Sequence, residues 1–211
     1  TFFEMLFWPF IGILSMGLMA SFLQIEQNYL AFILTGSIVS GVLQVTQLDV
    51  SYGLLYEVWA KSIKQTFLAP ISSIDYVLGS WIFGITRGTV VFVLLTFLSI
   101  WAFDFYPPKI SVIAVSLFGI YLNALIIGLI VCIFVVSFGQ KIDIIAWSLA
   151  ILAMLICGIY YPVNYLPKFF TFIAQLIPLT YFLEYFRSYY GFEPVFKHTL
   201  LKGFGLAISY I

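Results

Sequence analysis

The sequence predicts an all-α polytopic membrane protein, and two observations carry this prediction. Of the 211 residues, 63% are hydrophobic and only 9% are charged, and the mean hydropathy is +1.11. The surface of a soluble domain cannot be built from such a composition. Apolar runs close to the roughly 20 residues that a membrane-spanning helix needs also recur along the chain. We therefore expect one transmembrane domain over residues 1–211.

Six apolar runs are expected to be transmembrane helices, and the last of them is incomplete. The first run ends at the polar stretch 24–28, and the second ends at Gln47 and Asp49. A Pro-Pro turn at 104–109 separates the third run from the fourth. The last run would cover only about 20 Å, so either the natural chain continues beyond Ile211 or this element does not span. The runs are residues 5–23, 29–46, 76–103, 110–138, 142–159 and 198–211.

The loop 49–75 between the second and third runs has the pattern of an amphipathic helix. Its apolar residues recur at intervals of about four and form one stripe: Leu55, Val58, Trp59, Ile63 and Phe67. Glu57 and Lys61 stand at the favourable i,i+4 spacing, and Lys64 lies on another face than the stripe. Such a helix either lies on the bilayer surface or docks into a partner protein.

Arg87 is the one charged residue well inside a predicted span, about 18 Å along the helix from Asp75. A charge within the membrane is costly and marks a pathway or a pair. Either Arg87 recognises an anionic headgroup or phosphate, or it forms a structural ion pair or snorkels to one surface. Glu4, Glu57 and Asp75 are acids that we expect toward the same side, but the sequence names no partner.

Small and polar residues inside the third and fourth runs predict close helix packing. Ser80, Gly84 and Gly88 recur at four-residue spacing, which lets another helix of the same chain approach closely. Asn123 in the fourth run is expected to form a hydrogen bond to a neighbouring helix, with a role in transport as the alternative.

The connection 159–197, named here the Pro/aromatic segment, interrupts the membrane-like sequence. Its prolines remove backbone donors and break regular helix: Pro162, Pro167 and Pro178. We expect two short helices, 168–177 and 180–190, in place of one span. Their many rings suit the headgroup level of a membrane. Glu184 and Arg187 fall at i,i+3 and either pair on a helix face or act as part of a gate.

Motifs for catalysis or nucleotide binding are missing from the sequence. It contains no G-x-x-x-x-G-K-[ST], so the chain is not expected to bind ATP itself. His198 is the only histidine and has no Ser or metal-ligand neighbours at a useful spacing, while Cys132 and Cys157 lie in apolar runs. We expect no catalytic, cofactor or metal residues. The net charge of zero gives no indication of a nucleic-acid partner.

The ends and loops of the chain leave its orientation open. Because the chain begins with Thr1 and no basic segment precedes the first run, a cleaved signal peptide is not expected, and residues are expected to be missing at both ends. The Lys and Arg residues of alternate loops do not decide which end is inside.

Three motifs resemble those of ABC-2 type exporter permeases, and the resemblance covers nearly the whole chain. The order Tyr-Tyr-Pro, Leu-Pro and Pro-Leu-Thr, followed by Glu184 and Arg187, looks like the signature before the last transmembrane helix of that family. Residues 4–9, EMLFWP, look like the opening of its first span. Pro70 in LAPIS resembles the motif of its cytoplasmic loop.

The resemblance implies a role for each segment. It implies a cytoplasmic amino end, a coupling helix in loop 49–75 that docks into an ATPase subunit, and an external Pro/aromatic segment. It places the dimer seam at the first and fifth spans. The coupling residues would be Glu57, Trp59, Lys61 and Lys64. The external gate would comprise Tyr160, Tyr161, Pro162, Tyr165, Pro167, Pro178, Glu184 and Arg187, and the pathway candidates are Arg87 and Asn123.

These roles together imply the membrane subunit of an exporter in the plasma (inner) membrane of a prokaryote. Two copies, or this chain and a homologous permease, would form the pathway, and ATP with Mg would bind the separate ATPase subunits. The aromatic lining suits an amphipathic substrate: a lipid, a lipid-linked glycan or polysaccharide, or a drug.

The alternative is a self-sufficient membrane protein, either an ion-coupled transporter or an intramembrane enzyme. Ion coupling usually leaves acids or histidines within spans, and here the acids cluster near ends and loops. The first three runs show no similarity to the last three, as a transporter built from repeats would. The single histidine argues against a nucleophile with a base.

Overall fold

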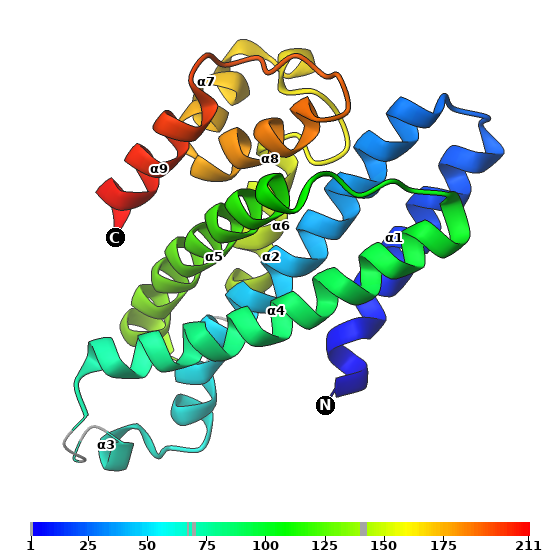
Figure 1. Cartoon of the computed structure of the whole chain (residues 1–211). Helices are drawn as coiled ribbons and strands as arrows, with labels where there is room; N and C mark the ends of the chain where they lie inside the picture. The colour runs from blue at the N-terminus through cyan, green and yellow to red at the C-terminus, as the bar shows by residue number, and fades with distance from the viewer. Residues whose placement is uncertain (1, 67, 69–70, 140–142) are drawn as a thin grey trace.

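The computed structural model describes residues 2–66, 68, 71–139 and 143–211, and every regular element in these residues is helical (Figure 1). The predicted all-α class is therefore confirmed. The elements in chain order are α1 (Phe2–Phe22), α2 (Gln27–Trp59), α3 (Ile63–Thr66), α4 (Ser73–Phe103), α5 (Ile110–Phe138), α6 (Asp143–Ile156), the 3-10 helix η2 (Val163–Tyr165), α7 (Lys168–Leu176), α8 (Pro178–Ser188) and α9 (Thr199–Tyr210).

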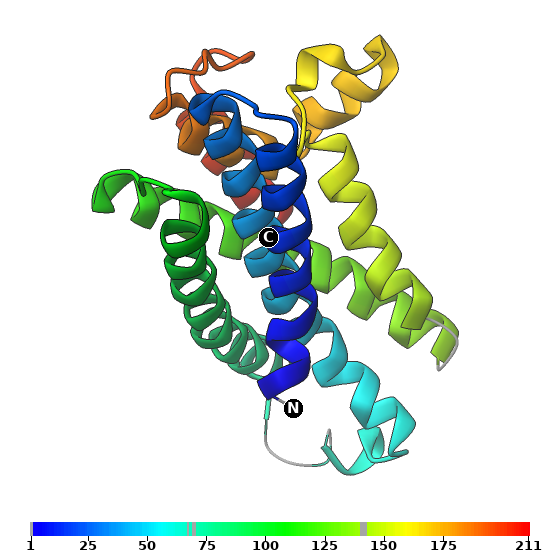
Figure 2. The ribbon, with the colours of Figure 1, turned by 90° about the vertical axis from the view of Figure 1, so that its right-hand side faces the viewer.

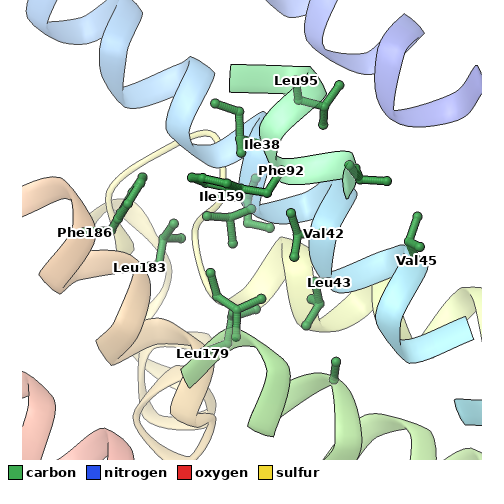
Figure 3. Close-up of a cluster of buried hydrophobic side chains, with 14 of the residues drawn as sticks. Ile38, Val42, Leu43, Val45, Phe92, Leu95, Ile159, Leu179, Leu183 and Phe186 are labelled. Carbon is green, nitrogen blue, oxygen red and sulfur yellow. The ribbon is translucent and has the colours of Figure 1, made fainter. Parts of the chain in front are cut away.

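Helix α2 is the centre of the molecule. It packs against α1, α4, α5, α6 and α8, which surround it (Figures 1 and 2). Its apolar side chains meet those of α4 and α8 in the main core, and Figure 3 shows Ile38 and Val42 of α2 near Phe92 of α4 and Leu183 of α8. A helix buried on most sides reads as apolar all round, which explains why α2 shows no single apolar stripe.

Three of the described helices are long and apolar enough to cross a membrane, namely α2, α4 and α5. Taken as one, the bent pair α7 and α8 passes the same test, whereas α1 and α6 are shorter apolar helices. The predicted bounds of α5, 110–138, agree with the structure. Those of α2 were wrong, because this helix does not end at residue 46 but continues to Trp59.

Buried polar side chains explain why α2 continues past its predicted end. Gln47 donates from Nε2 to Ser51 Oγ (2.8 Å) and to the carbonyl oxygen of Ala146 in α6 (3.3 Å). Thr46 donates to the carbonyl oxygen of Gly84 in α4 (3.2 Å). Polar groups with partners inside the bundle lose much of their burial cost, so they do not end the helix.

The two ends of the bundle carry different elements. The amino terminus and α3 lie at one end, and the turn from α1 to α2 lies with α7 at the other (Figure 2). At the first end, Ser72 begins α4 as its N-cap: its Oγ accepts from the backbone N of Asp75 (3.1 Å), and Asp75 Oδ2 accepts from the backbone N of Ser72 (3.2 Å). This capping box fixes where α4 starts.

The predicted small-residue stripe is confirmed as a contact within the chain. A side chain added at Gly84 would meet the carbonyl oxygen of Thr46 at 3.0 Å, and one added at Gly88 would overlap Thr46 Oγ1. The Ser80 hydroxyl lies where a side chain at Gly53 would be, 2.8 Å away. The stripe of α4 therefore faces α2 and allows the close approach that brings Arg87 to α2.

Candidate functional site

A cavity of about 790 Å³ lies between α1, α2, α4 and α6. Its walls include Trp8 of α1, Tyr52 and Tyr56 of α2, and Trp147 of α6, and they also hold Asp49 and Arg87. Ligand sites in proteins combine an apolar, often aromatic lining with a few polar groups. This cavity has that character and is the main candidate site in the described part of the chain.

Arg87 and Asp49 form an ion pair between α4 and α2, with Arg87 Nη1 donating to Asp49 Oδ1. The guanidinium also lies over the ring of Phe83, 5.5 Å from its centroid. The three acids that the sequence suggested as partners of Arg87 did not include Asp49. Asp49 was missed because it was taken as the polar end of the second span. The largely apolar stretch that follows it, VSYGLL from Val50 to Leu55, is the signal that could have placed it inside a helix.

Aromatic side chains of α2 form a connected cluster beside the cavity. The ring centroids of Tyr52 and Tyr56 are 5.5 Å apart, and those of Tyr56 and Trp59 are 5.3 Å apart. Trp147 Nε1 of α6 donates to the hydroxyl of Tyr52 at 2.6 Å. These edge and tilted contacts hold the rings in fixed positions, so this wall is a shaped apolar surface. The sequence analysis did not single out Tyr52, Tyr56 or Trp147.

Asn123, the second pathway candidate, does not line this cavity. It is buried in α5, and its Nδ2 has no hydrogen-bond partner among the described residues. The sequence predicts a hydrogen bond between Asn123 and a neighbouring helix, and the amide nitrogen does not form one with any described residue.

The Pro/aromatic segment folds as two short helices at the end opposite α3, as the sequence predicts. Helices α7 and α8 meet at Ile177 with a bend of 92°. Each proline stands where a missing N–H costs nothing: Pro162 precedes η2, Pro167 precedes α7, and Pro178 is the first residue of α8.

Arg187 is buried and joins three parts of the chain. Its Nη1 donates to the carbonyl oxygen of Gly158 (2.8 Å), and its Nη2 donates to that of Ile159 and to that of Phe32 in α2 (3.4 Å). Its guanidinium also lies over the Phe32 ring, with Cζ 3.4 Å from the centroid. Because the planar guanidinium carries several N–H donors, it can bind carbonyl oxygens of different chain segments at once. Arg187 thus ties α8 to α2 and to the turn after α6.

Glu184 has other partners than Arg187. Its Oε2 accepts from the backbone N of Phe196 (3.3 Å), which holds the chain that leads from α8 to α9. The hydrogen bonds of Glu184 and Arg187 go to other residues, although their charges still attract each other, so pairing and a gate role both stay predictions. Both are buried and hold the folded segment together.

The tyrosines of the predicted gate differ in exposure. Tyr165 is 80% exposed and Tyr160 is 39% exposed, so their rings are available at the surface of this end. Tyr161 instead donates its hydroxyl to the carbonyl oxygen of Leu155 at the end of α6. Of the predicted gate residues, Tyr160 and Tyr165 have exposed rings, whereas Glu184 and Arg187 are buried.

The loop 49–75 is not one amphipathic helix, which corrects the prediction. Residues up to Trp59 belong to α2, and Lys61 has a left-handed backbone (φ 56°) that ends regular helix. The short α3 follows, and Phe67 and Pro70 of the predicted motifs lie outside the described residues. Glu57 and Lys61 therefore do not share a helix face. Lys61 and Lys64 are both exposed.

Glu57 holds α3 against the end of α2. Its Oε2 accepts hydrogen bonds from the hydroxyls of Ser62 and Thr66 (2.8 Å for Thr66). We expect Glu57→Ala to release α3 and to speed the cleavage by trypsin after Lys61 and Lys64 several-fold, because proteases cut locally opened segments. Limited proteolysis with mass spectrometry measures this rate.

The control for this experiment is Glu193→Ala, which removes an exposed acid from the loop before α9. Trypsin should cut Glu193→Ala after Lys61 as slowly as it cuts the unchanged chain. Equal rates for Glu57→Ala and the unchanged chain would show that Glu57 does not hold α3.

Known proteins match almost the whole chain. Residues 2–190, from α1 through α8, match the family model described as ABC-2 type transporter. The inner membrane transport permease YadH of Escherichia coli K12 is 24% identical over 184 residues, which are 87% of this chain and 71% of that protein. The permeases of the same name from Escherichia coli O157:H7 and Shigella flexneri align equally well.

The motifs at both ends of the matched region had pointed to the same family. The prediction from those motifs is confirmed, because the family model covers residues 2–190 and all three motifs lie within this range. Apolar helices long enough to cross a membrane agree with a family of transport permeases. The chain belongs to the ABC-2 type transporter family and is a multi-pass transmembrane protein.

Proposed function

We propose that the chain is the membrane-spanning permease subunit of an ABC-2 type exporter for an amphipathic substrate. Two copies, or this chain and a homologous permease, enclose the pathway. Separate ATPase subunits bind ATP and Mg and drive it. Family membership supports the transport role. The similarity to an inner membrane transport permease of Escherichia coli supports an inner-membrane location in a prokaryote.

The observation that carries this proposal furthest is the position of the cavity. Residues of α1 and α6 line it together with residues of α2 and α4. Helices α1 and α6 are the first and fifth of the six spans in the proposal, which are α1, α2, α4, α5, α6 and α9. The family resemblance implies a dimer seam along the first and fifth spans, so the cavity would open toward a second permease. Its aromatic and charged walls suit an amphipathic molecule.

The two ends of the bundle take different roles in this proposal. The end with α3 faces the cytoplasm and the ATPase subunits, and Glu57, Trp59, Lys61 and Lys64 form or support the docking surface. The end with α7 and α8 faces outward as the external gate. Exposed rings at that end, such as Tyr165, would meet the substrate as it leaves.

Charge reversal at the α3 end tests the docking surface. We expect Lys61→Glu with Lys64→Glu to reduce the recovery of an ATPase at least about tenfold, because unlike charges at a rim attract and like charges repel. The measurement is a pull-down of the full-length chain from its native membrane in mild detergent, with mass spectrometry. Both lysines are exposed, and their replacement does not remove the hydrogen bonds of Glu57.

The matched control reverses two exposed lysines at the opposite end, Lys109→Glu with Lys168→Glu. This variant should recover as much ATPase as the unchanged chain, at about one ATPase per permease. A chain that never recovers an ATPase would contradict the proposed function. Recovery that is insensitive to Lys61 and Lys64 would contradict only the docking surface.

One observation favours a second candidate function, an ion-coupled transporter. Asp49 lies inside α2 and at the cavity, so the acids are not all at ends and loops. An acid within a membrane span is a common element of ion coupling. In proteoliposomes without any ATPase, this candidate requires transport that follows an imposed ion gradient and that Asp49→Asn abolishes. Transport that needs ATP and an ATPase excludes it.

A further inference from the structure

The cavity between α1, α2, α4 and α6 has the size of a site for a small organic molecule. Its volume is about 790 Å³, and drug-sized ligands occupy pockets of about 300–1,000 Å³. Aromatic rings from all four helices line it: Trp8, Tyr52, Tyr56, Phe83 and Trp147. Such a lining removes apolar surface from water and gives flat faces on which chains and rings can lie.

The charged group that a molecule in this cavity would meet is the guanidinium of Arg87. Both Arg87 and Asp49 line the cavity, and the Arg87 side chain is 30% exposed, whereas that of Asp49 is 11% exposed. A guanidinium presents five N–H donors in a plane and binds phosphate with two parallel hydrogen bonds. Asp49 orients the guanidinium and balances its charge when no ligand is present.

The position of Arg87 along α4 fits a molecule whose headgroup crosses the membrane. Arg87 follows Ser73, the first residue of α4, by 14 positions, about 21 Å along the helix axis. An anionic headgroup at such depth is costly unless a positive group receives it. The guanidinium of Arg87 supplies this group, and the aromatic walls accept the apolar part of the same molecule.

We propose that this cavity binds an amphiphile with a phosphate headgroup, with the Arg87 guanidinium holding the phosphate and the rings of Trp8, Tyr56 and Trp147 holding the apolar part. The inference rests on the proposed function, because it names the substrate class of that pathway. Beyond the proposed function, the inference assigns a binding site and the chemistry of the substrate's headgroup.

Binding to the purified full-length protein in mild detergent tests the proposal. Three probes separate the sources of the chemistry: dihexanoyl phosphatidic acid, the uncharged dihexanoylglycerol and inorganic phosphate. We expect the lipid phosphate to bind at least about tenfold more tightly than dihexanoylglycerol, because one hydrogen bond to a charged group contributes about this factor. We expect a similar advantage over inorganic phosphate, because the lipid also buries its apolar chains. Isothermal titration calorimetry measures the three dissociation constants.

Two variants identify the site. Arg87→Gln should remove the preference for the lipid phosphate over dihexanoylglycerol. Because this change leaves Asp49 without its cation and endangers folding, Trp8→Ala is the second variant: Trp8 is 60% exposed at the cavity wall. Trp8→Ala should weaken the binding of the lipid phosphate at least about fivefold, since it removes a large apolar contact. The matched control is Trp101→Ala, a 78% exposed residue of α4 outside the cavity, which should bind as the unchanged chain does.

Each other outcome overturns the proposal. Equal binding of inorganic phosphate and the lipid phosphate would show an anion site with no role for the apolar part. Equal binding of dihexanoylglycerol would show that Arg87 does not hold the phosphate, and an unchanged dissociation constant in Trp8→Ala would show that the lipid binds elsewhere. The ATPase pull-down is independent of this assay, so loss of lipid binding with a recovered ATPase contradicts this inference alone.

Discussion

Arg187→Ala is expected to lower the free energy of unfolding by about 3 kcal/mol or more, the largest effect of any substitution considered. The change removes the donor of three carbonyl oxygens, those of Gly158, Ile159 and Phe32. Two of these belong to the turn after α6, and the guanidinium is itself buried. A buried acceptor that loses its donor pays its full desolvation cost. The midpoint of thermal unfolding in mild detergent measures the loss.

Arg187→Lys separates geometry from charge. A lysine keeps the positive charge but has no planar fork, so it cannot reach all three carbonyls at once. Its stability should lie between those of Arg187→Ala and the unchanged chain. Lys202→Ala, an exposed position on α9, is the control and should unfold like the unchanged chain. If Arg187→Ala unfolds at the same temperature as Lys202→Ala, the anchoring role is wrong.

Gly36→Ala is expected to destabilise the protein by about 1–3 kcal/mol, the usual cost of overpacking. A methyl group at this position would overlap the carbonyl oxygen of Ile159, which is backbone and cannot turn away. It would also lie 2.9 Å from Nη2 of Arg187 and disturb the same anchor. The thermal midpoint in mild detergent again gives the measurement.

Gly12→Ala is the matched control, because nothing lies within 4 Å of the added methyl group in α1. An alanine in a helix is favoured over glycine by about 0.5–1 kcal/mol. The same chemical change should therefore act in opposite directions at the two positions. A Gly36→Ala protein that is as stable as Gly12→Ala would show that α2 can move away from the turn after α6.

The sequence predicted α5, α7 and α8 well, because residues at or next to their ends determine where these helices begin and end. The Pro-Pro turn and the uninterrupted apolar run gave both ends of α5, and Pro167 and Pro178 gave the two short helices α7 and α8. The spacing of Gly84 and Gly88 predicted a close helix contact. These features depend on neighbours in the sequence, so counting residues was enough.

Features that depend on distant residues were missed. Gln47 and Asp49 looked like the end of a span, but Gln47 donates to the carbonyl oxygen of Ala146 in α6 and Asp49 pairs with Arg87 of α4. The predicted amphipathic helix was wrong for the same reason. The first half of that predicted helix belongs to α2, which continues to Trp59. Glu184 and Arg187 looked like neighbours on one helix face, and yet the hydrogen bond of Glu184 leads to Phe196 and that of Arg187 leads to the turn after α6.

The length of α2 has a mechanical consequence. One unbroken helix contains both Glu57, which holds α3, and Phe32, which receives Arg187 at the opposite end. The two residues are 25 positions apart, so a tilt of about 5° at one end displaces the other by about 3 Å over roughly 37 Å. α2 can therefore act as a lever arm. A movement of the short α3 would tilt α2 and displace Phe32, the residue of α2 that Arg187 of the Pro/aromatic segment contacts.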